Sequence, residues 1–242
     1  MGRHRDLSFD LISDIHLDHW QSDFPLDNFK EADFLLIGGD LSNNTPRGRE
    51  IASIFLEKMS RVYDHVVYIK GNHDFYGLVS GLDESYGDFP NVHYLNREIK
   101  EIGGVKFAGC MAWYEVGVGL NDLYAIPNAI EFSKREKAKD FDFLESLEDV
   151  DVLMTHVPLS FTAIHPSYYG NKLNKYFFHD REDLITKSFP SLYLCGHTHH
   201  KRGFKLSQTH CILYPVGYPH ENRRQQMVYP RRWIFKSEGD KD

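Results

Sequence analysis

The chain has 242 residues, of which 41% are hydrophobic and 14% are aromatic, so a sizeable core is possible and wholesale disorder is excluded. Its formal net charge of −7 argues against a protein that coats duplex nucleic acid through phosphate contacts alone. The three cysteines are an odd number without C-x-x-C spacing, which is typical of reduced thiols in a cytosolic protein.

The N-terminus lacks the features of a targeting signal. The opening residues MGRHRDLSFD turn polar at once, and Asp6 stands where a myristoylation signal needs Ser or Thr. No apolar run approaches the length of a membrane span. We therefore expect a cytoplasmic protein without a membrane partner. Because nothing resembles a linker, we expect one domain over residues 1–242.

Six short apolar runs, mostly β-branched or aromatic, predict buried strands. They cover residues 7–13, 32–39, 65–71, 105–110, 151–155 and 191–196. Between the second and third runs, residues 49–61 predict a crossover helix. Its inner face would carry Ile51, Ile54, Phe55 and Lys58.

The second half of the chain adds a longer, charge-rich helix, predicted at residues 129–147. After residue 203 the pattern changes to alternating segments at 211–216 and 231–235, which is typical of antiparallel strands. Together these elements predict a mixed α/β protein, compatible with two packed sheets. Two stretches without periodicity, 111–128 and 157–180, are rich in Tyr, Asn, Gly and Pro and are candidate loops over a site.

Polar side chains of ligand type follow five of the predicted strands. Asp14 and His16 come just after the first strand, and both point the same way because residues two apart share one face of an extended chain. The others are Asp40 after the second strand, Asn72, His73 and Asp74 after the third, His156 after the fifth, and His197 and His199 after the sixth. Open α/β sheets build their sites at these carboxyl ends. Gly39, Gly71 and Gly196 fit sharp strand exits where the backbone is approached closely.

Taken together, these residues favour a metal site. Each motif alone is weak, and His19, His200 and His220 are treated as ordinary half-buried histidines. The ligand set of two Asp, one Asn and four His includes no thiolate, which favours Mn, Fe, Zn or Ni over an iron–sulfur cluster or a Mg-only site; its members are Asp14, Asp40, Asn72, His16, His156, His197 and His199. Seven ligands are too many for one tetrahedral ion but suit two ions that share a carboxylate. Paired ions about 3.5–4 Å apart clamp a phosphate and lower the pKa of a water between them.

The motifs D-x-H, G-D, G-N-H-D/E, a lone His and G-H-x-H occur in this order from Asp14 to His199 and resemble the calcineurin-like metallophosphoesterase family. The resemblance implies a four-layer αββα sandwich of two mixed β-sheets flanked by helices, with a dinuclear site at the strand ends. One ion would be held by Asp14, His16, Asp40 and His199, and the other by Asp40, Asn72, His156 and His197. Asp40 would bridge them, and Mn is the metal we expect to act in an assay.

The same resemblance gives His73 the role of a catalytic histidine that is not a ligand. Asn72 and His73 would both contact the substrate phosphate and take part in catalysis. Related Ser/Thr protein phosphatases carry an Asp where this chain has Asn43, so phosphoprotein substrates are disfavoured and the group that orients His73 stays open. Asp74 is expected to cap the following turn.

Four further segments resemble a branch of small, uncharacterised bacterial and phage-type phosphoesterases. They are GCMAWYE (109–115), LNDLYAI (120–126), FFHDREDLI (177–185) and PVGYPHEN (215–222). The branch suggests no particular substrate, and the oligomeric state has no signature in the sequence.

We therefore expect hydrolysis of a phosphomonoester or phosphodiester by in-line attack of a hydroxide shared by two ions. The substrate would be a small phosphate ester or a nucleotide-like molecule, selected by the two loops. The loop residues proposed for this role are Trp113, Tyr114, Asn121, Tyr168, Tyr169, Lys172 and Lys175. The aromatic rings would stack on a base or sugar, and the lysines would meet a second phosphate.

Two alternatives remain open. A nuclease acting on DNA or RNA is suggested by ENRRQQMVYPRRW (221–233), where four arginines are interleaved with Tyr229 and Trp233. The acidic net charge favours a solvated edge strand there instead, so nucleic acid is possible but not favoured. A non-catalytic, metal-poor scaffold with the same fold is disfavoured because no ligand position has been lost.

Overall fold

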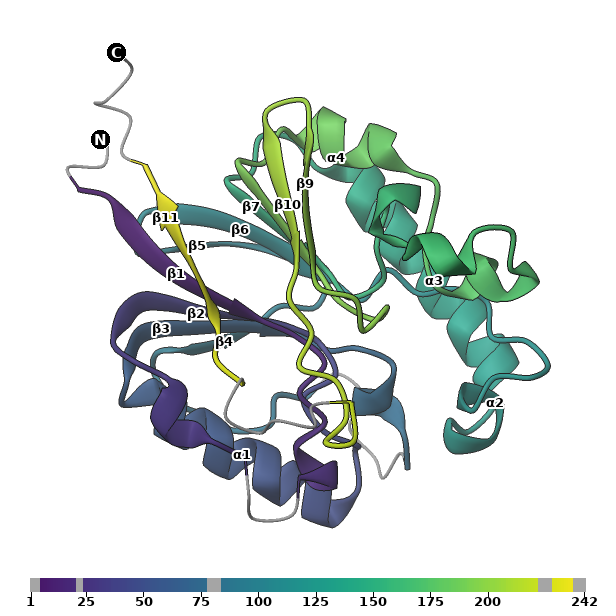
Figure 1. Cartoon of the computed structure of the whole chain (residues 1–242), viewed down its shortest axis with the longest axis horizontal. Coiled ribbons are helices and arrows are strands. Elements are labelled where there is room, and N and C mark those ends of the chain that lie inside the picture. The colour runs from purple at the N-terminus through teal and green to yellow at the C-terminus, as the bar shows by residue number, and fades with distance from the viewer. Residues whose placement is uncertain (1–4, 21–23, 78–83, 222–227, 237–242) are drawn as a thin grey trace.

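Two β-sheets packed face to face, with helices on both outer faces, make up the computed structural model, which describes residues 5–20, 24–77, 84–221 and 228–236 (Figure 1). The first sheet has the order β11-β1-β2-β3-β4 and the second β5-β6-β7-β8-β10-β9. Both are mixed: in the first, β11 pairs antiparallel with β1 while β1, β2 and β3 are parallel, and in the second, β10 is parallel to β8 and antiparallel to β9. The predicted fold class, a four-layer αββα sandwich, is confirmed.

The elements have the following bounds. The first sheet contains β1 (Leu7–Ile12), β2 (Ala32–Gly38), β3 (Tyr63–Ile69), β4 (Val92–Tyr94) and β11 (Arg231–Phe235). The second contains β5 (Glu98–Ile102), β6 (Val105–Cys110), β7 (Val152–Thr155), β8 (Leu192–Cys195), β9 (Arg202–Leu206) and β10 (Thr209–Leu213). The helices are α1 (Pro46–Ser60), α2 (Asp122–Ala125), α3 (Ala129–Ser146) and α4 (Glu182–Ser188).

The central strands are apolar throughout because both of their faces are covered. In β2, Phe34 and Leu36 lie in the core between the two sheets, whereas Leu35 and Ile37 lie in the core beneath α1. All six predicted strands are confirmed, as are the two predicted segments near the C-terminus. The sequence missed β4, β5 and β9, which are largely half-exposed or exposed and therefore lack a buried apolar run.

Helix α1 begins earlier than predicted and buries a different face. Thr45 accepts a hydrogen bond from the Gly48 N–H, and Pro46 occupies the first turn, so the helix starts at residue 46 rather than 49. The buried stripe consists of Ala52, Phe55, Leu56 and Met59. Ile54, predicted to face inward, is 47% exposed, because the 52-55-56-59 spacing forms a more complete apolar stripe.

The parallel strands of both sheets end at one edge of the sandwich, where the backbone of Ser13 also bridges to Pro215. This edge carries the polar residues singled out in the sequence. The three cysteines are buried, and none forms a disulfide. Across the described ranges, no helix is both long enough and apolar enough to cross a bilayer.

Candidate metal centre

All seven predicted ligands lie together at this edge. The Nε2 atoms of His16 and His199 are 3.1 Å apart, and His199 Nε2 is 3.6 Å from Asp14 Oδ1. Asp40 Oδ2 lies 3.7 Å from His16 Nε2 on one side and 3.4 Å from His156 Nε2 on the other. Asp40 thus lies between two groups of ligands.

The second group forms around His156. The Oδ1 atom of Asn72 lies 3.2 Å from His156 Nε2, and the rings of His156 and His197 are 5.1 Å apart. The Nε2 atom of His197 faces the Tyr176 carbonyl oxygen at 3.0 Å, so Nδ1 is the ring nitrogen that could face a metal.

The donor set fits divalent cations. Asp14 and Asp40 are almost fully buried, and the ion pairs described for them involve only histidines. Two imidazole Nε2 atoms 3.1 Å apart need either a shared proton or a cation between them. His16 Nδ1 is also buried without a hydrogen-bond partner among the described residues. Buried oxygen and nitrogen donors in this arrangement suit Mn, Fe, Zn or Ni.

The protonation of the cluster without metal shows how strongly these groups interact. Burial raises the pKa of Asp14. Burial also opposes ionisation of Asp40, but His156, His73 and His16 together outweigh it and hold the pKa of Asp40 well below its usual range. Burial also disfavours the charged form of His156, but Asp40, Asp14 and the Gly38 carbonyl together raise its pKa to about 9, whereas burial lowers the pKa of His197 to about 3. Metal binding would displace the protons shared by these groups.

Five of the seven ligands have left-handed backbones. The φ angles are 50° at Asp14, 50° at His16, 54° at Asp40, 68° at His197 and 48° at His199. This region costs a residue other than glycine roughly 1 kcal/mol. Backbone hydrogen bonds hold it in place: Asp14 N–H donates to the Gly39 carbonyl at 2.9 Å, and His16 N–H to the Asp40 carbonyl at 3.0 Å.

Gly71 confirms the predicted close approach at the strand exits. A β-carbon at this position would lie 2.2 Å from Asp40 Oδ1 and 2.6 Å from His156 Nε2. We expect Gly71→Ala to displace both ligands and lower turnover by about 10²-fold, the scale of a misplacement near 1 Å. Metal content and kcat measured together test this, with Gly203→Ala as the control because a β-carbon there meets only the end of the Arg231 side chain. Equal kcat in the two variants would contradict the prediction.

Two ligand histidines are oriented by groups that the sequence analysis did not identify. His199 Nδ1 lies 2.8 Å from Glu221 Oε2, and His156 Nδ1 lies 2.8 Å from the Gly38 carbonyl oxygen. Such partners fix the ring so that the other nitrogen faces the metal. Glu221 belongs to the PVGYPHEN segment, so this motif does contribute to the site.

Asp122 orients the amide ligand. Its Oδ1 accepts hydrogen bonds from Asn72 Nδ2 and from the Tyr114 hydroxyl, both at 2.9 Å, and the carboxylate is buried. Because Nδ2 is held by Asp122, Asn72 Oδ1 points toward His156. Asp122 and Tyr114 come from the LNDLYAI and GCMAWYE segments, whose role the sequence alone left unexplained.

We expect Asp122→Leu to weaken metal binding by about 10- to 100-fold, the usual effect of removing a partner that orients a ligand. Asp122→Asn keeps an oxygen that can accept both hydrogen bonds, so its affinity should stay near that of the wild type. Calorimetric titration of the apo-protein with Mn²⁺ measures both. If Asp122→Leu binds Mn²⁺ as tightly as the wild type, Asp122 does not orient Asn72 for metal binding.

His73 uses both of its ring nitrogens away from the ligand cluster. Nδ1 lies 3.1 Å from Asn43 Oδ1, and Nε2 lies 3.2 Å from the Tyr218 hydroxyl. A ring nitrogen of His73 is also within 4.8 Å of ligand atoms of His16 and Asp40, so these two contacts, rather than distance, set it apart from the ligands. Asn43 therefore lies where it could orient the ring of His73.

Asp74 does not act as the predicted turn cap. Its carboxylate accepts the backbone N–H groups of Gly71 at 2.7 Å, Leu41 at 3.1 Å and Ser42 at 3.2 Å, as well as the Tyr86 hydroxyl at 2.7 Å. It therefore ties the exits of β2 and β3 together. Burial, together with the nearby Asp40, raises the pKa of Asp74 to about 6.

A cavity of about 470 Å³ opens from the ligand cluster between the two predicted loops. Tyr114, Asn121 and Tyr168 line it, as the sequence suggested. The other proposed loop residues, Trp113, Tyr169, Lys172 and Lys175, are not among its lining residues. Both loops therefore lie over the site, but the lysines do not face it.

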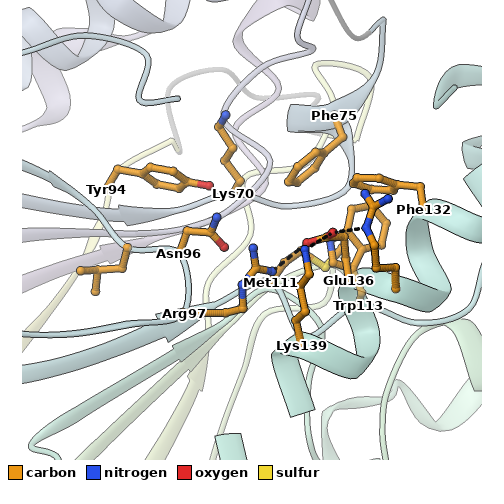
Figure 2. A pocket seen from close by; sticks show the side chains of 12 residues that line it. Lys70, Phe75, Tyr94, Asn96, Arg97, Met111, Trp113, Phe132, Glu136 and Lys139 are labelled. Carbon is orange, nitrogen blue, oxygen red and sulfur yellow. Dashed lines mark hydrogen bonds and ion pairs between the residues drawn. The ribbon is translucent and has the colours of Figure 1, made fainter. Parts of the chain in front are cut away.

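A second, smaller cavity of about 90 Å³ lies beside α3, with Lys70 on one side and Arg97, Glu136 and Lys139 on the other (Figure 2). Glu136 pairs with Arg97 at 3.0 Å, Arg135 at 2.9 Å and Lys139 at 3.0 Å. Because this cluster of cations has its own carboxylate partner and includes no ligand residue, it does not extend the metal centre.

The arginine-rich segment at 221–233 is described only in part, since residues 222–227 lie outside the described ranges. Arg231 and Arg232 belong to the edge strand β11, and Arg232 pairs with the buried Asp10 at 2.5 Å. The ring of Trp233 packs 5.8 Å from Phe9. The described part thus has a structural role in the sheet.

The fold and this cluster together define the class of metal-dependent phosphoesterases. The chain belongs to the calcineurin-like phosphoesterase family, whose model matches residues 7–201. An uncharacterized protein of Acanthamoeba polyphaga mimivirus is 25% identical over 260 residues, which covers 87% of this chain and 91% of that protein. Family and fold point to a hydrolase, and the ligand clusters suit the divalent metals typical of the family.

Solved structures show the same fold. The crystal structure of phosphopantetheinyl hydrolase from Mycobacterium tuberculosis is similar with a TM-score of 0.65 and 18% identity, covering 97% of this chain and 96% of that one. A putative 5′-nucleotidase from Staphylococcus aureus has a TM-score of 0.50 and 14% identity, covering 86% of this chain and 48% of that one. At these identities the likeness concerns the fold alone.

Proposed function

We propose that the chain hydrolyses small phosphate esters with two divalent ions held by its seven ligand side chains. The observation that carries this proposal is the buried Asp40 carboxylate, which lies between His16 and His156 at 3.7 and 3.4 Å. One ion would be held by Asp14, His16, Asp40 and His199, and the other by Asp40, Asn72, His156 and His197. When bound, the ions would neutralise the phosphate and activate a water for attack on phosphorus.

The remaining chemistry is assigned to residues of this chain. His73 lines the cavity, and with Nδ1 held by Asn43, its Nε2 would deliver a proton to the leaving oxygen. Asn72, held by Asp122, would present its amide oxygen to the metal and stay close to the phosphate. The catalytic and substrate-binding roles of Asn72 and His73 are part of this proposal.

The nuclease and the scaffold are less well supported. No lysine or arginine is among the described residues that line the cavity, whereas a nucleic-acid groove is normally basic. A non-catalytic scaffold protein would not need all seven proposed ligands and His73 in one cluster, so their presence argues against that alternative.

A metal-reconstituted activity screen tests the proposal. The apo-protein is loaded with Mn, Fe, Zn or Ni and assayed with p-nitrophenyl phosphate, bis-p-nitrophenyl phosphate, cyclic nucleotides and single-stranded DNA. We expect metal-dependent turnover of a small ester, with Mn among the active metals. Faster cleavage of DNA than of any small ester would favour the nuclease, and no turnover with any metal would favour the scaffold.

A further inference from the structure

We propose that the substrate carries its phosphate on an uncharged organic arm, and that the cavity beside the metal centre binds this arm. The inference rests on the proposed function and deepens it by naming a substrate class: phosphate esters without a second phosphate. At about 470 Å³, the cavity is within the size range of pockets that enclose small organic molecules.

The aromatic wall of this cavity begins at the metal ligands themselves. Phe177 stacks on the His197 ring with centroids 5.1 Å apart, and Tyr218 stacks on His16 at 4.4 Å. The wall also contains Leu120, Ile164, Tyr168, Leu173 and Tyr176. An arm that leaves the phosphate therefore meets aromatic and aliphatic surface, which favours uncharged groups.

The polar groups of the wall include three amides besides that of Asn72. Asn121, Asn171 and Asn174 line the cavity. Asn171 Oδ1 accepts from the Leu173 N–H at 2.9 Å, and Asn174 Nδ2 donates to the Tyr168 carbonyl at 2.8 Å. These contacts leave the opposite end of each amide, one donor and one acceptor, for hydrogen bonds to neutral groups such as amides and hydroxyls.

The charges of the cavity disfavour a second phosphate. Its acidic lining residues are Asp40, Asp122 and Glu221, and no lysine or arginine is found among the lining residues that the structure describes. Lys175, expected from the sequence to meet a second phosphate, instead places its Nζ 4.7 Å from the Tyr176 ring centroid. Beyond the proposed ions, a second phosphate would thus lose water without gaining a lysine or arginine partner from the described lining residues.

The experiment compares two ligands that differ by one phosphate. Manganese-loaded protein is first assayed with p-nitrophenyl phosphate and bis-p-nitrophenyl phosphate, which tests the proposed function alone. Thymidine 5′-phosphate and thymidine 3′,5′-bisphosphate are then compared as inhibitors of the faster reaction. We expect the bisphosphate to have an inhibition constant at least about tenfold higher, because its second phosphate would be desolvated against a wall whose described residues supply no lysine or arginine.

A positive charge placed in the wall should reduce or remove this preference. Asn171→Lys is expected to lower the inhibition constant of the bisphosphate about tenfold. Tyr124→Lys, on the same chain but 84% exposed and outside the cavity lining, should leave it as in the wild type. The double variant Lys172→Ala, Lys175→Ala should also leave both inhibition constants unchanged.

Three outcomes would overturn the inference while the proposed function stands. The first is that the bisphosphate inhibits as well as the monophosphate. The second is that Asn171→Lys and Tyr124→Lys change the inhibition constant of the bisphosphate equally. The third is that thymidine 5′-phosphate inhibits no better than inorganic phosphate. In the last case the cavity does not bind the arm. Absence of turnover with both chromogenic esters is a different result, because it rejects the proposed function and the inference with it.

Discussion

Asp40→Ala is expected to lose both metal ions and to lower turnover by at least about 10³-fold, the scale of several kcal/mol of lost transition-state stabilisation. The reason is geometric: the Asp40 carboxylate is the group that lies between the His16 and His156 sides of the cluster. The alanine also leaves the surrounding histidines without their shared anionic partner. Elemental analysis of the purified variant, with kcat measured in parallel, checks the prediction.

The matched control is His199→Ala, which removes a ligand proposed for one ion only. This variant should keep about one ion per chain, whereas Asp40→Ala should keep none. One ion in the wild type, or two retained in Asp40→Ala, would rule out the dinuclear arrangement.

His73→Ala is expected to lower kcat by roughly 10²–10⁴-fold, the usual scale for a lost general acid, while both metal ions stay bound. Both ring nitrogens of His73 already have partners outside the ligand cluster, namely Asn43 and Tyr218. Metal content by elemental analysis and kcat at saturating substrate distinguish a general acid from a metal ligand. A loss of metal in proportion to activity would make His73 a ligand instead.

A second variant tests how His73 is oriented. Asn43→Leu removes the oxygen that faces His73 Nδ1. Asn43→Asp keeps an oxygen acceptor beside Nδ1 and introduces the residue type of the protein phosphatases. We expect the leucine variant to lower kcat with little change in metal content, and the aspartate variant to retain activity. Similar kcat values in both would mean that Asn43 does not position the ring.

The metal ligands were predictable because each follows a buried strand. A short apolar run fixes where the strand ends, and parallel strands then bring Asp14, Asp40, Asn72 and His156 to one edge without further information. The strand exits at Gly71 and its counterparts could be inferred for the same reason. Strand ends and the residues that follow them can therefore be predicted from short stretches of sequence.

The orienting residues were not predictable, because their partners are set by tertiary contacts between irregular segments. Asp122 meets Asn72 across 50 positions of sequence, and Glu221 meets His199 from a segment without periodicity. The inner face of α1 was misassigned for a related reason. Ile54 is as apolar as its neighbours, and only the packing against the first sheet shows that it faces solvent.

The left-handed ligand residues have a consequence for how this protein would respond to substitution. Glycine adopts positive φ without a penalty, so glycine at position 14 or 199 would relieve strain in the fold while it destroys a ligand. At these positions the ligand side chain and an unstrained backbone exclude each other, so stability and function make opposite demands on the same five residues.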